Sequence, residues 1–117
     1  MKVNTDGSVL GNHASCSGIF HDHHGTFVGC FSSNLGSFSV FESGLLGFIH
    51  AMEIAYNKGW MNLWIEGDSK STLLVFRNHD LVPWKLRNRW ANCVNYDIQL
   101  LLSHVFCEGN TCAVQIS

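Results

Sequence analysis

The first third of the chain alternates short runs of apolar and β-branched residues with turn residues. Residues 2–8, 14–22 and 26–34 have the composition of strands, and Gly-rich or His/Gly segments separate them. His23, His24 and Gly25 together suit a tight reversal of the chain. The pattern therefore predicts an antiparallel meander of three strands.

From Ser39 onward the spacing of apolar residues changes to three and four. Phe41, Leu45 and Met52 belong to this series, which indicates one helix with a broad apolar face. The helix is expected to end at Lys58 and Gly59, since glycine commonly terminates helices.

Alternation returns after this helix and then gives way to a second helical segment. Residues 61–66 alternate as a strand, and Asp68 with the residues that follow it suits a helix start. This second helix is expected to run to about Arg77, with Pro83 excluding any continuation.

The last third of the chain is less regular. An amphipathic pattern over residues 85–102 predicts a third helix, and residues 104–107 predict a short last strand. Asn110 is expected to cap the remainder of a final helix. A helix between the meander and the fourth strand favours a mixed sheet, because parallel strands need a long crossover.

Length and composition are those of one domain, expected to span residues 1–117. The chain has 117 residues, 46% of them hydrophobic and 14% charged, and no run approaches the roughly 18 apolar residues of a membrane span. Five cysteines without a CxxC pair favour neither a disulfide framework nor a zinc site. We expect a monomer with reduced thiols, in the nucleus or the cytoplasm, with no visible targeting signal.

The charge balance excludes a broad electrostatic grip on a polyanion. Seven Lys and Arg residues against nine Asp and Glu residues give a net charge of −2. The basic cluster at residues 85–89 fits a solvated face at a helix start better than a phosphate contact, on charge pattern alone.

Three acidic residues stand at positions where chemistry is plausible, and each has an ordinary structural alternative. Asp6 stands at the end of the first strand, and the pair Asp6-Gly7 is also a common turn signal after a strand. Glu42 completes an S-x-x-E capping box with Ser39, yet it shares a helix face with apolar residues. Asp68 can cap a helix and also lies at the carboxyl end of a strand, where α/β sheets keep ligand sites.

Histidines offer two further candidates. His104 stands near the start of the last strand, and a lone histidine there is more often structural than a proton carrier. The cluster at residues 21–24 resembles a metal site at first sight, but it falls on a hairpin tip without a fourth ligand. We interpret it as a turn.

Four motifs in one order are more specific than any one of them. They are Asn-Thr-Asp-Gly-Ser at residues 4–8, Phe-Glu-Ser-Gly-Leu-Leu-Gly-Phe at 41–48, Glu-Gly-Asp-Ser-Lys at 66–70 and Ser-His-Val-Phe-Cys-Glu-Gly-Asn-Thr-Cys-Ala at 103–113. Their order and spacing resemble type 1 ribonuclease H, especially the short domains related to plant non-LTR retrotransposons. The resemblance extends from Lys2 to Ala113.

The resemblance implies an α/β fold with a five-stranded mixed sheet, its first three strands antiparallel, flanked by helices. It implies Mg²⁺, or alternatively Mn²⁺, as the cofactor, with Asp6, Glu42 and Asp68 as metal ligands and catalytic residues. His104 matches a histidine that assists proton movement or product release. The implied substrate contacts are at Gly7, Ser8, Asn12 and Ser69.

The sequence departs from the family pattern at its end. The family has a fourth carboxylate after the motif at residues 108–113, where this chain has Val114, which offers no oxygen ligand. Only three residues follow, so the usual closing helix is expected to be truncated. Phe41 replaces a usual alanine, and His13 and Ala14 replace a Pro-Gly pair after Asn12.

Two functions from different classes follow from these observations. The first is Mg²⁺-dependent endonucleolytic hydrolysis of the RNA strand of RNA–DNA hybrids, weakened by Val114. The alternative is a catalytically inactive, degenerate retroelement-derived domain that binds nucleic acid or persists as a folded remnant. Exonuclease or integrase chemistry is less favoured, because such proteins space their carboxylates differently.

Overall fold

A computed structural model describes residues 1–36, 39–67, 72, 74–108 and 111–116. From residue 104 onward, it describes the backbone but not the side chains. No helix among the described residues is long and apolar enough to cross a membrane. The elements are β1 (Lys2–Leu10), β2 (His13–His21), β3 (Phe27–Gly36), α1 (Val40–Lys58), β4 (Asn62–Gly67), η1 (His79–Leu81), η2 (Trp84–Leu86), α3 (Arg87–Val94), β5 (Gln99–Glu108) and β6 (Thr111–Ile116).

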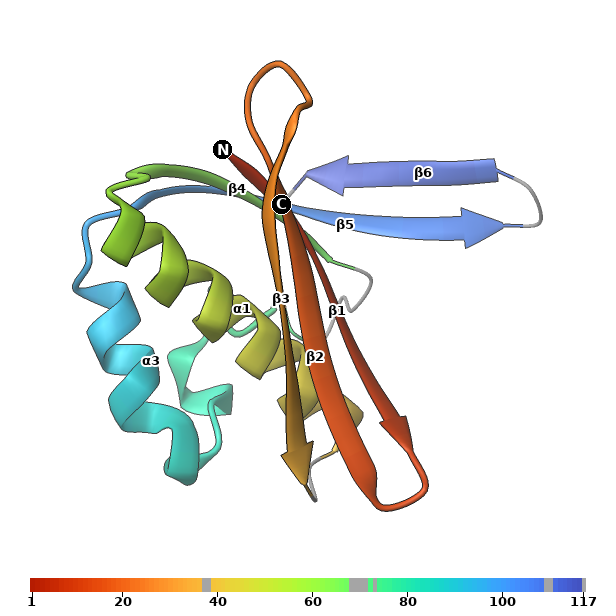
Figure 1. Cartoon of the computed structure of the whole chain (residues 1–117). Coiled ribbons are helices and arrows are strands. Elements are labelled where there is room, and N and C mark those ends of the chain that lie inside the picture. Colours follow the sequence, from red (N-terminus) through yellow and green to blue (C-terminus); the bar gives the residue numbers. More distant parts are fainter. Residues whose placement is uncertain (37–38, 68–71, 73, 109–110, 117) are drawn as a thin grey trace.

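One mixed sheet organises the molecule, with strand order β3-β2-β1-β4-β5-β6. The meander β1-β2-β3 is antiparallel, whereas β4 pairs parallel with both β1 and β5. The predicted five-stranded mixed sheet is thereby confirmed, and β6 extends it by antiparallel pairing with β5. Figure 1 shows α1 and α3 on the same side of this sheet.

Helix α1 begins and ends where the sequence predicts. Ser39 is the N-cap, and its hydroxyl accepts a hydrogen bond from the Glu42 amide while the Glu42 carboxylate accepts one from the Ser39 amide. Gly59 ends the helix with φ of 75°, a left-handed conformation that glycine adopts without strain.

The core lies between α1 and the sheet. Strand residues with buried side chains alternate with outward ones, so Val3 and Thr5 of β1 and Leu63 and Ile65 of β4 face the helix. The largest fully buried side chains also include Phe20, Leu45, Phe48, Ile49 and Met52. Burying each such side chain stabilises the fold by roughly 1.5–3 kcal/mol.

The predicted third helix is wrong in its second half. Helix α3 ends at Val94, Asp97 has a positive φ of 60°, and residues 99–102 belong to β5. The run Leu100–Leu102 is apolar enough to fit a helix face or a buried strand. These residues form a strand because they pair with β4, which comes from a distant part of the sequence.

The expected remnant of a final helix is also wrong. Residues 111–116 form β6, in which Val114 lies opposite Val105. Their sequence is rich in residues that favour strands, and β5 offers a free edge to pair with. Asn110 itself lies outside the described residues. The start of the predicted second helix, at Asp68, likewise lies outside the described residues. Further along this predicted helix, positions 72 and 74 are helical and a turn follows at 75–77.

Candidate functional site

The carboxyl end of β4 lies between β1 and β5 and brings the motifs together. Gly67 is the register partner of Thr5 on one side and of His104 on the other. Asp6 follows Thr5 directly. Asp68 and Ser69 follow Gly67 in sequence but lie outside the described residues, so their side chains are not placed.

Asp6 occupies the face of the sheet opposite α1. Its neighbours Thr5 and Gly7 face the helix, and side chains alternate along a strand, so the Asp6 carboxylate points the other way and is exposed. Among the described side chains, none forms a hydrogen bond or ion pair with this carboxylate. Asp6 can therefore accept a ligand without breaking an existing contact.

Close approach of two backbones brings the first turns of α1 against the middle of β1. A Cβ atom at Gly7 would lie 2.6 Å from the Gly44 nitrogen and 2.7 Å from the Ser43 carbonyl carbon. Only glycine fits between strand and helix at this distance. The residue after Asp6 thus touches the residue after Glu42, although their carboxylates stand on different elements.

Glu42 has both carboxylate oxygens engaged. Oε1 accepts the Ser39 amide at 3.1 Å, and Oε2 lies 3.1 Å from Nζ of Lys85. Burial acts to raise the pKa of Glu42, but the Ser39 amide and the Lys85 ammonium outweigh it, so this pKa is below its ordinary value. Glu42 is therefore a carboxylate at neutral pH, held as a cap and as an ion pair.

The basic cluster at residues 85–89 is tied into the protein. Besides the Lys85 contact, Arg87 donates to the backbone carbonyls of Val82 and Asp80, at 3.0 and 3.3 Å. Arg89 binds Glu53 through two hydrogen bonds of 2.6 and 3.2 Å. The three basic side chains of this cluster therefore have partners within the protein. From the sequence alone, the expected roles for them were a solvated face or a phosphate contact.

The histidine cluster at residues 21–24 is built as a turn. Oδ1 of Asp22 accepts hydrogen bonds from the amides of His24 and Thr26, at 2.9 and 3.0 Å. The Thr26 bond is the main reason why the pKa of Asp22 lies below its ordinary value. In the described part of the chain, no three His, Cys, Asp or Glu residues are grouped so that they could hold a metal ion.

The remaining predicted site residues have different surroundings. Ser8 and Ser15 share a hydrogen bond of 2.9 Å between their hydroxyls. Asn12 is exposed in the turn between β1 and β2. For His104 and Val114 the structure describes the backbone, which places His104 beside Gly67 and opposite Gln115.

An acidic residue that sequence reasoning missed lies on the same face as Asp6. Glu66 is in register with Asn4, two residues before Asp6, and its Oε2 lies 3.1 Å from Nζ of Lys2. Ser103 accepts a 2.7 Å hydrogen bond from the Trp64 indole and donates to Glu66 at 3.4 Å. In the sequence, the position of Glu66 on this face is indicated by the alternation of inward and outward side chains along β1 and β4.

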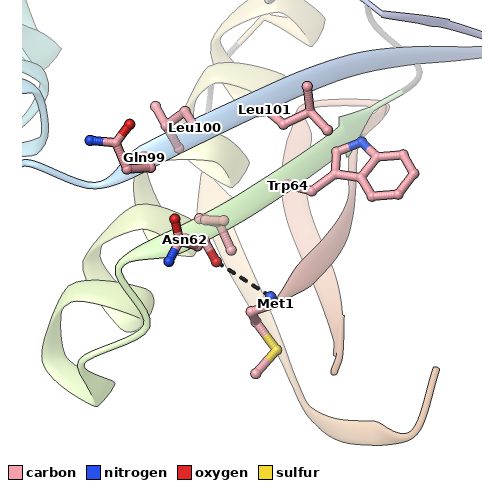
Figure 2. A pocket seen from close by; sticks show the side chains of 7 residues that line it. Met1, Asn62, Trp64, Gln99, Leu100 and Leu101 are labelled. Atoms are coloured by element: carbon pink, nitrogen blue, oxygen red, sulfur yellow. Dashed lines mark hydrogen bonds between the residues drawn. The ribbon is translucent and has the colours of Figure 1, made fainter. Parts of the chain in front are cut away.

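The cavity in Figure 2 lies at the opposite end of β4. Its volume is about 280 Å³, and a hydrogen bond of 3.3 Å joins the Met1 amino group to the Asn62 carbonyl at its rim. The lining residues are mainly uncharged: Met1, Asn62, Leu63, Trp64, Gln99, Leu100 and Leu101. The cavity is lined by the first residues of β4, Asn62 to Trp64, whereas the acidic motifs meet at its last residue, Gly67.

Comparison with known proteins gives one family. The family model described as reverse transcriptase-like matches residues 4–116. An Arabidopsis thaliana protein provisionally named a ribonuclease H protein is 36% identical over 72 residues, which are 60% of this chain and 12% of that protein. The chain thus matches only a small part of that relative.

Solved structures share the fold at low sequence identity. RNase H1 of Halobacterium salinarum superposes with a TM-score of 0.75 at 18% identity, covering 89% of this chain and 83% of that one. The N-terminal RNase H domain of a Mycobacterium tuberculosis protein gives 0.76 at 17%, covering 92% and 88%. LC11-RNase H1, solved with an RNA/DNA hybrid, gives 0.72 at 18%, covering 88% and 83%.

Proposed function

Because the chain belongs to the reverse transcriptase-like family of ribonuclease H-like domains, we propose that it binds RNA–DNA hybrids and hydrolyses their RNA strand weakly, with Mg²⁺ or Mn²⁺. The observation that carries the proposal is the register of Thr5, Gly67 and His104 across three neighbouring strands. It supports a common location for the motifs that follow these residues. Ligand sites of α/β sheets occupy such strand ends.

The residues present offer ligands for one hard cation rather than two, and these ligands stand on different sides of β1: the Asp6 side chain is on the sheet face opposite α1, whereas Glu42 is in α1. Asp6 offers an exposed carboxylate, and the lowered pKa of Glu42 keeps this second carboxylate ionised at neutral pH. Asp68 is the proposed third ligand. Val114 offers no oxygen where the family has its fourth, and Mg²⁺ is commonly held by one or two carboxylates with water completing its shell.

A divalent cation held by these residues would lower the pKa of a bound water and stabilise charge on the leaving oxygen of a phosphodiester. The chain itself supplies orientation. The capping box fixes the Glu42 backbone, and the contact at Gly7 fixes β1 against α1. We assign His104 to proton movement or product release, and Gly7, Ser8, Asn12 and Ser69 to substrate contacts.

A second candidate is an inactive domain that binds nucleic acid or is a folded remnant of a mobile element. Two observations favour it. Val114 removes a ligand, and the side chains of Arg87 and Arg89 are both used inside the protein, which leaves less positive charge for phosphates.

A cleavage assay on three proteins separates the two candidates. The natural chain, Asp6→Asn and Val114→Asp are each incubated with a labelled hybrid and with double-stranded DNA, in Mg²⁺ and in Mn²⁺. The proposal expects slow cleavage of the hybrid RNA strand by the natural chain, none by Asp6→Asn and faster cleavage by Val114→Asp. Cleavage by Val114→Asp alone would identify the natural chain as inactive.

A further inference from the structure

Strand β3 forms one edge of the sheet, where it pairs with β2 and has no second partner among the described strands. Each of its residues is exposed or half-buried. In an antiparallel pair, every second residue directs its backbone N–H and C=O away from the neighbouring strand. The outer edge of β3 therefore presents backbone donors and acceptors that another strand can take up.

The sequence of β3 lacks the side chains that commonly protect such an edge. Natural sheets discourage pairing at their edges with charged residues, proline or bulges. Residues 27–36 read Phe-Val-Gly-Cys-Phe-Ser-Ser-Asn-Leu-Gly, without a charge or a proline. Shifts in register leave Val28 and Leu35 without a residue opposite them in β2, so the bulges lie near the two ends of β3. The stretch between them, residues 29–34, is regular.

Side chains along this regular stretch leave its backbone accessible. Phe31 is the one large side chain, and its ring packs inward against Phe20 and His50, with centroid distances of 6.0 and 5.9 Å. Gly18 of β2 gives the ring this room, since a Cβ atom there would collide with it. The other five residues are small: Gly29, Cys30, Ser32, Ser33 and Asn34.

A second copy of this chain fits this edge. Antiparallel pairing of two identical strands is two-fold symmetric, so each copy offers the other the same stretch. An uncharged strand meets no like charge in its own copy, and a net charge of −2 gives only weak repulsion between two domains. Helix α1 packs mainly on β1, β2 and β4, which leaves room beside β3.

We propose that two copies pair antiparallel through residues 29–34 of β3 and join their sheets across a two-fold axis near Phe31 and Ser32. The assembly is closed, because each copy uses its β3 edge once. The contact is short, so the dimer forms at high protein concentration and dissociates on dilution. It departs from the monomer expected from the sequence, and it is independent of the proposed function, since β2 separates β3 from β1.

Sedimentation equilibrium of the whole chain over about a hundredfold range of concentration tests the proposal. We expect the mass to rise from that of one chain toward that of two. Ser32→Lys places an exposed charge near the axis, where it meets its own copy, and should raise the dissociation constant at least about tenfold. Cys30→Lys, also at an exposed position, is a second variant with the same expected result. Asn92→Lys, exposed in α3, is the matched control and should keep the natural constant.

Hydrogen exchange of the backbone amides locates the contact. Amides of residues 29–34 that point away from β2 should exchange at least about tenfold more slowly in concentrated than in dilute natural protein, and Ser32→Lys should abolish this difference. The mass of one chain at every concentration would overturn the inference and leave the edge to a strand of another protein. Growth beyond a dimer, or association that both lysine variants of β3 leave unchanged, would overturn it as well.

Discussion

Thr5 of β1 and Gly67 of β4 face each other so closely that a Cβ atom on Gly67 would lie 3.2 Å from Oγ1 of Thr5 and 3.0 Å from a ring carbon of Phe48. These two residues directly precede Asp6 and Asp68. Their contact therefore sets the distance between the middle of β1 and the end of β4, after which Asp68 follows in sequence. The absence of a side chain at Gly67 therefore has a packing reason.

Gly7→Ala should destabilise the fold by about 2 kcal/mol or more, since overpacked positions typically cost 1–3 kcal/mol. The new methyl group would meet backbone atoms of Ser43 and Gly44 at 2.6–2.9 Å, and backbone cannot move aside as a flexible side chain can. Gly29→Ala in β3 is the control, because nothing lies within 4 Å of its Cβ position. Urea unfolding measures both, and equal midpoints would contradict the close packing of α1 on β1.

Ser39→Ala should lower the free energy of unfolding by about 1 kcal/mol, the usual cost of losing an N-cap side chain. The Ser39 hydroxyl accepts the Glu42 amide at 3.1 Å, and alanine leaves this donor without its cap. Ser32→Ala, at an exposed position of β3, is the matched control and should change stability by less than about 0.5 kcal/mol. A loss no larger than that of the control would show that the capping box contributes little.

Among the three cysteines whose side chains the structure describes, Cys30 should react first with iodoacetamide. Cys30 is exposed, whereas Cys16 and Cys93 are buried. Burial raises the pKa of both buried thiols, that of Cys93 to about 12, so almost no thiolate forms there near pH 8. Peptide mapping after brief alkylation gives the order. Early modification of Cys93 would contradict its burial, in which its thiol donates a 3.9 Å hydrogen bond to the Ile49 carbonyl.

Stability should fall as the pH drops below about 6.5, with His50 contributing to the fall. Burial and the nearby Arg89 lower the pKa of His50 from its ordinary value of 6.5, although Glu53 acts in the other direction. Between the folded and the ordinary pKa the unfolded chain binds more protons, so acid favours unfolding. The contribution of neutral His50 to the free energy of unfolding is therefore fully present above about pH 6.5, and it is lost as the pH falls toward the lowered pKa of His50.

His50→Gln tests this dependence. The difference between urea midpoints at about pH 7.5 and pH 5 should be smaller in this variant than in the natural chain. His13→Gln, at the exposed start of β2, should keep the natural difference. A pH dependence in His50→Gln as large as in the natural chain would remove His50 from the explanation.

Local signals and long-range pairing account for what the sequence could and could not predict. The capping box and Gly59 lie within the segment they delimit, so α1 was predicted with its ends. The run Leu100–Leu102 has no such local signal, and its conformation depends on β4, far away in sequence. The same reason explains β6, which exists by pairing with β5.

The candidate site shows the same division. Asp6 and Glu42 stand in motifs that could be recognised residue by residue. The register of β1, β4 and β5 agrees with a location of the Asp6 motif beside Gly67 and His104, and the close approach at Gly7 brings α1 against the same part of β1. The partners of these residues could not be predicted. Lys85 reaches Glu42, and Lys2 reaches Glu66, only because the folded chain brings separate elements together.

Site-resolved metal binding tests the central claim, that Asp6 in the middle of β1 and Asp68, which follows β4 in sequence, share a divalent cation. In two-dimensional NMR spectra, substoichiometric Mn²⁺ should first broaden the amide signals of Asp6, Gly7 and Gly67, and Asp6→Asn should abolish this selective loss. Broadening that begins at the turn of residues 21–24, or that spreads evenly over the chain, would contradict the account.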